Sequence, residues 1–133
     1  ARAIAALPPA DIARIGMVAA RARAVNALAA AVEAGTVSLE PGGDVEASMR
    51  ALVALPGIGD WTASYIAMRA LRWPDAFPAG DVALHKALGV QGLKSPARQA
   101  TLASGAWAPW RSAAAWYLWR AADAAKRSTF KPQ

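Results

Sequence analysis

Apolar residues recur every three or four positions along most of the chain, in segments separated by glycine and proline. Such spacing is typical of amphipathic helices, because residues three and four apart share one helical face. The clearest case is residues 18–34, where Val25, Leu28 and Val32 fall near one face while the charged residues lie elsewhere. Gly35 then closes this predicted helix.

Start and stop signals divide the rest of the chain into further helices. Asp44 is a good N-cap for a helix that the dipeptide Pro56-Gly57 must end. Another helix follows almost at once, so a very short hairpin joins the two within about residues 44–70. Residues 73–80 contain two prolines and a glycine and are predicted to be irregular. The remaining predicted helices cover about residues 8–16, 81–88, 95–103 and 109–125.

The composition agrees with these helical patterns. Alanine, leucine and arginine are abundant and β-branched residues are sparse, which favours an all-α protein over a sandwich or a barrel. The chain has 133 residues, 56% of them hydrophobic, and neither a repeat nor a linker, so residues 1–133 are expected to form a single domain. We expect a compact bundle of about six to seven helices. A basic tail, residues 126–133, follows the last helix and is expected to fray.

The net charge of +6, carried mainly by arginine, favours polyanionic partners, with nucleic acid first among them. A high-GC genome produces the same arginine-rich and alanine-rich composition, so charge alone does not decide. Cysteine is absent, which excludes disulfides, thiolate metal sites and iron–sulfur clusters, and His85 alone cannot build a metal site. No apolar run is long enough for a membrane span, and the first residues lack a signal-peptide core, so we expect a cytosolic protein without a membrane partner.

The most informative segment is Leu55–Ala63, in which two glycines flank Ile58 between two helices. Glycine permits left-handed backbone and close approach of a phosphate, the first amides of the second helix face outward, and Ile58 can anchor the turn in the core. Such a hairpin can hold a DNA backbone without reading its sequence. An ordinary αα-hairpin is the alternative, because glycine and proline are common between helices.

This hairpin and the loop Phe77–Asp81 resemble the helix-hairpin-helix motif and the aspartate-bearing loop of the base-excision DNA glycosylases. Three further segments, Gly43–Met49, Trp61–Tyr65 and Pro109–Ser112, narrow the resemblance to the DNA-3-methyladenine glycosylase II family, in order over nearly the full chain. The resemblance implies the helix-hairpin-helix glycosylase fold. It also implies that these residues are the C-terminal part of such a protein, without the small α/β domain and the further helices that precede it in the family.

The resemblance gives a catalytic role to Asp81. In the family, the matching aspartate stabilises the oxocarbenium-like sugar that forms as the N-glycosidic bond breaks, or helps to orient water to it. A carboxylate near developing positive charge in a water-poor site supplies preorganised stabilisation. A helix N-cap is the alternative, since aspartate before an amphipathic segment is a standard cap, and both roles can hold at once.

Aromatic residues are candidates for a base pocket. Trp61 and Tyr65 lie four residues apart and share a helical face, and Trp119 lies in the last predicted helix. In the resembled family, residues matching these three line the pocket for the flipped base, and electron-rich rings suit a cationic N-alkylated purine. Core packing is the alternative for all of them, and it is the role expected of Trp110 and Trp116.

The resemblance also implies how DNA is held. The hairpin residues that match backbone-binding positions of the family are Pro56, Gly57, Ile58, Gly59 and Thr62. A monovalent cation, Na⁺ or K⁺, would bind the main-chain carbonyls of Val53, Leu55 and Ile58 when DNA is present, and no other cofactor is implied. Candidates for phosphate contacts are Arg69, Arg72, Lys86 and Lys94.

Trp61 occupies the position at which bifunctional relatives carry a Schiff-base lysine, so a covalent imine from this position is excluded. We therefore predict a monofunctional, monomeric bacterial glycosylase, cytoplasmic and nucleoid-associated. It would release bases of the 3-methyladenine and 7-methylguanine type from double-stranded DNA and leave an abasic site. The alternatives are a non-catalytic helix-hairpin-helix DNA-binding module, in which Asp81 is only a cap, and a helical interaction module without a nucleic-acid role.

Overall fold

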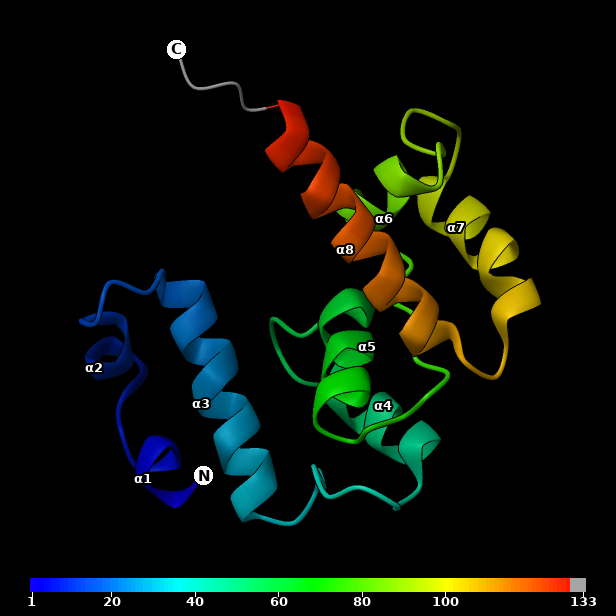
Figure 1. Ribbon diagram of the computed structural model, residues 1–133. Helices are drawn as coiled ribbons and strands as arrows, with labels where there is room; N and C mark the ends of the chain where they lie inside the picture. The colour runs from blue at the N-terminus through cyan, green and yellow to red at the C-terminus, as the bar shows by residue number, and fades with distance from the viewer. Residues whose placement is uncertain (130–133) are drawn as a thin grey trace.

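The structure, a computed structural model, describes the backbone of residues 1–129 and the side chains of residues 1–124. All regular structure in this part of the chain is helical, which confirms the predicted all-α class. None of the described helices combines the length and apolarity that crossing a bilayer requires. The helices are α1 (Arg2–Ala5), α2 (Pro9–Ala13), α3 (Ala19–Glu33), α4 (Val45–Val53), α5 (Asp60–Arg69), α6 (Val82–Ala87), α7 (Pro96–Ser104), the 3₁₀ turn η1 (Gly105–Trp107) and α8 (Arg111–Thr129) (Figure 1).

One helix was not predicted from the sequence, and another ends later than predicted. The short helix α1 was not predicted, because its ordering depends on a distant side chain: the Asn26 amide donates to the carbonyls of Ile4 and Leu7 at 3.0 and 2.9 Å. Helix α8 continues to Thr129, beyond the predicted end near residue 125, because no glycine or proline interrupts it there. The fraying predicted for the tail concerns residues that include 130–133, which lie outside the described part of the chain.

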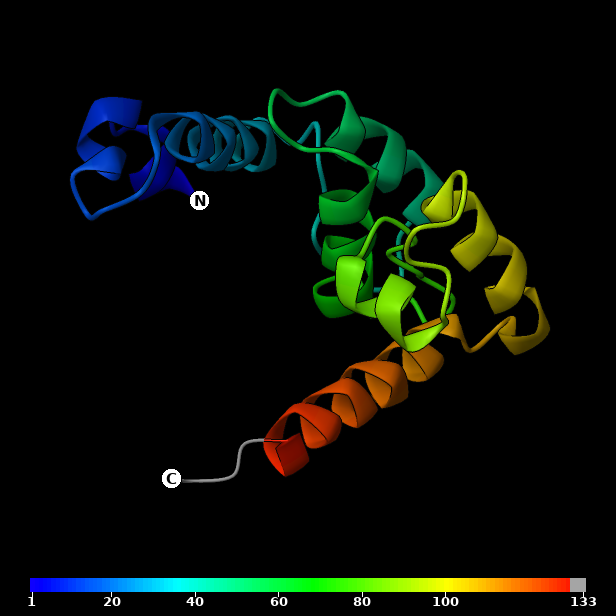
Figure 2. The same ribbon diagram turned by 90° about the horizontal axis from the view of Figure 1, so that it is seen from above.

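Two groups of helices, α1–α3 and α6–α8, flank the hairpin formed by α4 and α5 (Figures 1 and 2). Helices α1 and α2 pack on α3, whereas α4 and α5 form the predicted hairpin, and α6 packs on both α7 and α8. Figure 2 shows α1–α3 and α8 extending to the same side from opposite ends of the central α4–α6 group. Helix α5 is therefore packed between segments that lie far apart in the sequence.

Two apolar clusters hold the hairpin between these groups. In the first, Ala31 and Val37 contact Leu52, Ile58 and Ala63, so Ile58 anchors the turn in the core as predicted. Burying each of the larger side chains, Val37, Leu52 and Ile58, stabilises the fold by about 1.5–3 kcal/mol. The second cluster joins the end of α5 and the following loop to α6 and α8 and contains Ala67, Met68, Leu71, Ala76, Leu84 and Ala115.

The two hairpin glycines serve different purposes. Gly57 has a φ of +81°, and a Cβ built on it would lie 3.0 Å from the Ala24 Cβ of α3. Both the left-handed backbone and the packing against α3 therefore require glycine. Gly59 is the N-cap of α5, with φ −97° and ψ 177°, and nothing lies within 4 Å of a Cβ built there. The fold itself does not require glycine at position 59.

We expect Gly57→Ala to lower the free energy of unfolding by about 2 kcal/mol, because it adds strain at positive φ and crowds Ala24. Gly59→Ala is the matched control, with an expected change within about 0.5 kcal/mol. Urea denaturation followed by circular dichroism measures both values. Equal destabilisation by the two substitutions would contradict the assigned role of Gly57.

Candidate active site

Asp81 begins α6 and caps it. Its Oδ1 accepts a hydrogen bond from the Leu84 N–H at 2.9 Å, and its backbone φ and ψ of −75° and 122° are typical of an N-cap. The capping alternative for Asp81 is therefore correct as a description of the local geometry. A single capping bond leaves the other acceptor positions of the carboxylate free for further partners.

Two indoles use these positions. The Trp61 Nε1–H of α5 donates to Asp81 Oδ2 at 2.9 Å, and the Trp119 Nε1–H of α8 donates to Oδ1 at 3.2 Å. Partial burial alone would raise the pKa of Asp81, but the hydrogen bonds from the amides of Leu84 and Ala83 and from both indoles outweigh it. The pKa therefore lies below its ordinary value. At neutral pH, Asp81 carries a negative charge.

The aromatic residues predicted to line a base pocket lie together around this carboxylate. Trp61 stacks on Tyr65 with ring centroids 5.5 Å apart and planes 15° apart, and Tyr65 lies 6.1 Å from Trp119 at 53°. Trp61 and Tyr65 are already in direct contact, so a base cannot lie between them in this arrangement. Trp61 is 42% exposed, which leaves part of its ring accessible. These three side chains and Asp81 form what we call the Asp81 cluster.

The expectation that Trp110 and Trp116 pack in the core is wrong: they are 64% and 42% exposed. Ser112 and Ala115 occupy the buried positions at the start of α8, and the two tryptophans lie away from them. Trp116 instead meets Trp119 edge to face, with centroids 5.8 Å apart. The Arg69 guanidinium, which was a candidate phosphate contact, lies 4.7 Å from the Trp116 ring centroid.

The loop that leads to Asp81 is tied to the beginning of α8. Arg111 donates from Nε and from an Nη to the two carboxylate oxygens of Asp75 at 2.7 and 2.6 Å, and this contact holds the pKa of Asp75 below its ordinary value. The Ser112 hydroxyl donates to the carbonyls of Trp73 and Ala76 at 2.7 and 2.9 Å. These residues position the loop.

Sequence reasoning missed these anchoring residues. The segment Pro109–Ser112 was noted for its family resemblance, but its partner lies 36 residues earlier and no local pattern connects the two. His85 was considered only as a metal ligand, whereas its Nε2–H donates to the Ala79 carbonyl at 2.6 Å. The one available signal was Asp75 itself, an acidic residue in an irregular loop. A partly buried aspartate requires a basic or hydrogen-bonding partner, which the sequence alone did not identify.

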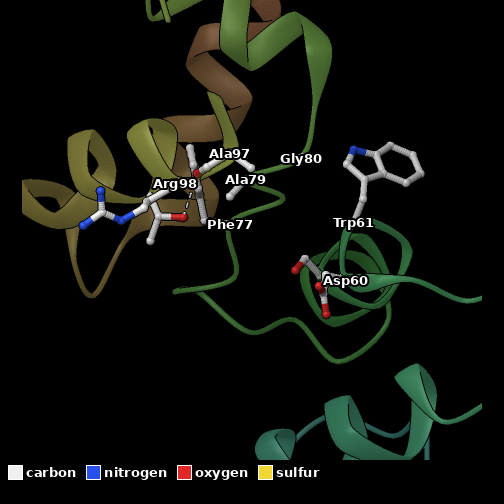
Figure 3. A pocket seen from close by; sticks show the side chains of 9 residues that line it. Asp60, Trp61, Phe77, Ala79, Gly80, Ala97 and Arg98 are labelled. Carbon is white, nitrogen blue, oxygen red and sulfur yellow. Dashed lines mark hydrogen bonds between the residues drawn. The ribbon is translucent and has the colours of Figure 1, made fainter. Parts of the chain in front are cut away.

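A cavity of about 340 Å³ adjoins Trp61 (Figure 3). In Figure 3, Arg98 of α7 lies on one side, with Asp60 and Trp61 of α5 on the other. Asp81 does not line it, so the cavity and the carboxylate are separate features that share Trp61. Its lining residues are Asp60, Trp61, Ser64, Phe77, Ala79, Gly80, Ala97, Arg98 and Thr101.

The hairpin residues predicted to bind a DNA backbone surround the start of α5. Pro56, Gly57 and Gly59 are exposed, Thr62 is half-buried, and the first amides of a helix lack intrahelical acceptors. Ile58 is buried, so its side chain faces the core and only its backbone can serve a ligand. The acidic side chain of Asp60 in the first turn distinguishes this hairpin from a purely basic surface.

The three carbonyls implied as cation ligands differ in their hydrogen bonding. The Leu55 carbonyl accepts from the Ile58 N–H at 3.2 Å, across the turn. Within the described residues, the carbonyls of Val53 and Ile58 accept no backbone hydrogen bond. Unpaired carbonyl oxygens are suitable ligands for a hard cation, and Val53 and Ile58 offer such oxygens, whereas that of Leu55 is engaged in the turn.

Comparison with known proteins identifies relatives of this chain, although no family model matches it. It is 46% identical over 99 residues to the "probable bifunctional transcriptional activator/DNA repair enzyme AlkA" of Mycobacterium tuberculosis, which covers 74% of this chain and 20% of the relative. It is 38% identical over 117 residues to DNA-3-methyladenine glycosylase 2 of Escherichia coli (86% and 40%). It is 35% identical over 124 residues to DNA-3-methyladenine glycosylase of Bacillus subtilis (88% and 40%).

These relatives are named as DNA repair enzymes and DNA glycosylases. More narrowly, the chain is homologous to the DNA-3-methyladenine glycosylases, which confirms the resemblance inferred from its motifs. The chain spans between a fifth and two fifths of the length of these relatives.

We expect Asp75→Asn to lower the free energy of unfolding at neutral pH by about 2 kcal/mol, the scale of hydrogen bonds to a charged group. Because Arg111 lowers the folded-state pKa of Asp75, this contribution is complete above the unfolded-state pKa of about 3.9. It disappears as the pH falls through the lower folded-state pKa. Urea unfolding at neutral and acidic pH measures the difference.

The control is Asp11→Asn, which removes a largely exposed ion pair with Arg14 and should change stability by under about 1 kcal/mol. A loss for Asp75→Asn that stays the same at acidic pH would show that the contribution of Asp75 does not depend on its charge.

Proposed function

We propose that this chain is part of a monofunctional DNA glycosylase that hydrolyses the N-glycosidic bond of alkylated purines flipped out of double-stranded DNA. The observation that carries the proposal is an ionised carboxylate, Asp81, held among Trp61, Tyr65 and Trp119. The homology to DNA-3-methyladenine glycosylases supports the same class of substrate. Bases of the 3-methyladenine and 7-methylguanine type are the expected products.

The chemistry follows from the two kinds of groups in the Asp81 cluster. As the glycosidic bond breaks, positive charge develops on the sugar, and the negative charge of Asp81 stabilises it electrostatically. An N-alkylated purine is itself cationic, so it stacks on the exposed indole of Trp61 with a cation–π attraction of about 0.5–2 kcal/mol. A cationic base leaves readily, so no acid is needed to protonate it. The electron pair of the broken C1′–N bond leaves with the purine, which departs as a neutral base; water then adds to C1′ of the sugar cation and loses its proton to the solvent.

The hairpin is the proposed anchor for the DNA backbone. Its exposed glycines and the amides at the start of α5 can bind phosphate without reading base sequence. A monovalent cation on the carbonyls of Val53 and Ile58, and on Leu55 if its turn hydrogen bond is shared, would reinforce this attachment when DNA is present. Trp61 stands where a lysine would form an imine, so the strand is left uncut at an abasic site. We also propose that the protein acts as a monomer in the bacterial cytoplasm, at the nucleoid.

We expect Asp81→Asn to reduce base release from methylated duplex DNA by about a hundred- to a thousand-fold while DNA binding is retained. Asparagine caps a helix as well as aspartate does, so the substitution removes the charge and keeps α6 capped. The measurement is release of free methylated base, on this chain and on the protein extended toward its N-terminus.

Asp44→Asn is the matched control, because Asp44 caps α4 with the same geometry, accepting from the Ala47 N–H at 2.9 Å. It should leave base release unchanged. Salt-sensitive DNA binding without base release, identical in wild type and Asp81→Asn for the extended protein, would instead identify a non-catalytic DNA-binding module.

A further inference from the structure

The two oxygens of Asp81 are not equivalent. Of the hydrogen bonds of 3.2 Å or less, Oδ1 accepts two, from the Leu84 N–H and the Trp119 Nε1–H, whereas Oδ2 accepts one, from the Trp61 Nε1–H; the Ala83 amide adds a weaker contact to the carboxylate. A carboxylate oxygen accommodates about two such bonds. Oδ1 is therefore fully occupied, and Oδ2 is the oxygen that remains available to a reacting group.

We propose that the two indole N–H groups are positioning donors with different tasks: Trp119 holds Asp81 throughout the reaction, and Trp61 occupies Oδ2 only until the substrate displaces it. This inference rests on the proposed glycosylase function. Both tryptophans then do more than line a base pocket: their indole N–H groups, not their ring faces, position the carboxylate of Asp81.

Trp119 is held on several sides. It is half-buried on α8 between Tyr65 and the edge-on ring of Trp116, and α8 itself is fixed at its start by the contacts of Arg111 and Ser112 to the loop before Asp81. A side chain packed in this way keeps one orientation. Its N–H therefore points at Oδ1 whether or not DNA is bound.

Trp61 has room to move. It is 42% exposed and borders the 340 Å³ cavity, and its ring contact is the stack on Tyr65, along which the indole can slide. Its hydrogen bond competes with any cation for Oδ2. A sugar or base that enters the cluster displaces this N–H, and Oδ2 then faces the developing positive charge with no competing donor.

Phenylalanine at either position removes the N–H and keeps an aromatic ring. Replacement by the isostere β-(3-benzothienyl)alanine removes the N–H without changing the bicyclic shape, and so separates the hydrogen bond from packing. Trp110→Phe, at an exposed position outside the Asp81 cluster, is the control. The readouts are the pH titration of the Asp81 carboxyl carbon by NMR in the DNA-free chain and the pH profile of single-turnover base release.

For Trp119, loss of the N–H should raise the Asp81 pKa in the DNA-free chain. It should also move the acid limb of base release to higher pH and lower the plateau rate by about tenfold, with KM unchanged. For Trp61, the same loss should raise the DNA-free pKa but leave the acid limb in place, because in the DNA complex the N–H has already been displaced. Trp110→Phe should alter neither readout.

The NMR titration follows the Asp81 carboxyl itself, so other ionisable groups nearby do not obscure it. Within the described side chains, those on α5 to α8 are Asp60, Tyr65, Arg69, His85, Lys86, Arg98, Arg111, Tyr117, Arg120 and Asp123.

Unchanged titration and an unchanged acid limb in both Trp119 variants would overturn the inference, as would a Trp61 variant that shifts the acid limb as far as the DNA-free pKa. A pKa rise in both variants, without base release from the wild-type protein, would uphold the indole donation and refute the proposed glycosylase.

Discussion

A partly desolvated negative charge at Asp81 is the constraint on which the centre of this structure depends. Removing a carboxylate from water is costly unless donors replace its hydration. Here the donors come from three helices: the Leu84 amide of α6, the indole of Trp61 on α5 and the indole of Trp119 on α8. Any displacement of one helix relative to the others would leave the charge under-satisfied, so the carboxylate fixes the relative positions of all three.

The irregular loop before Asp81 is held by directional polar contacts as well as by the burial of Ala76 and Pro78. Its carbonyls accept from Ser112 and His85, and its only acidic side chain, Asp75, pairs with Arg111. Directional hydrogen bonds at the start of α8 supply the precision, and so the same helix positions both the loop and Trp119.

Local signals in the sequence predict most of the helices, the short hairpin, the buried Ile58 and the cap formed by Asp81, because each depends on neighbouring residues. Features that join distant segments escape such reasoning. The ordering of α1 by Asn26 and the pairing of Asp75 with Arg111 involve partners far apart in the chain. The exposure of Trp116 follows from which face of α8 is buried, and periodicity in an alanine-rich helix leaves that face poorly defined.

The cap formed by Asp81 and the catalytic role proposed for it support each other. The cap bond orients the carboxylate and, with the indoles, keeps it ionised, but every donor that stabilises its charge also weakens its attraction for a developing cation. A site that acts through charge therefore needs firm donors on one oxygen and a removable donor on the other. Trp119 sits on the occupied oxygen within a packed aromatic group, while the half-exposed Trp61 holds the other. The more buried Trp119 can thus act as the firm donor and the more exposed Trp61 as the removable one, as stabilisation of a carbocation by Asp81 would require.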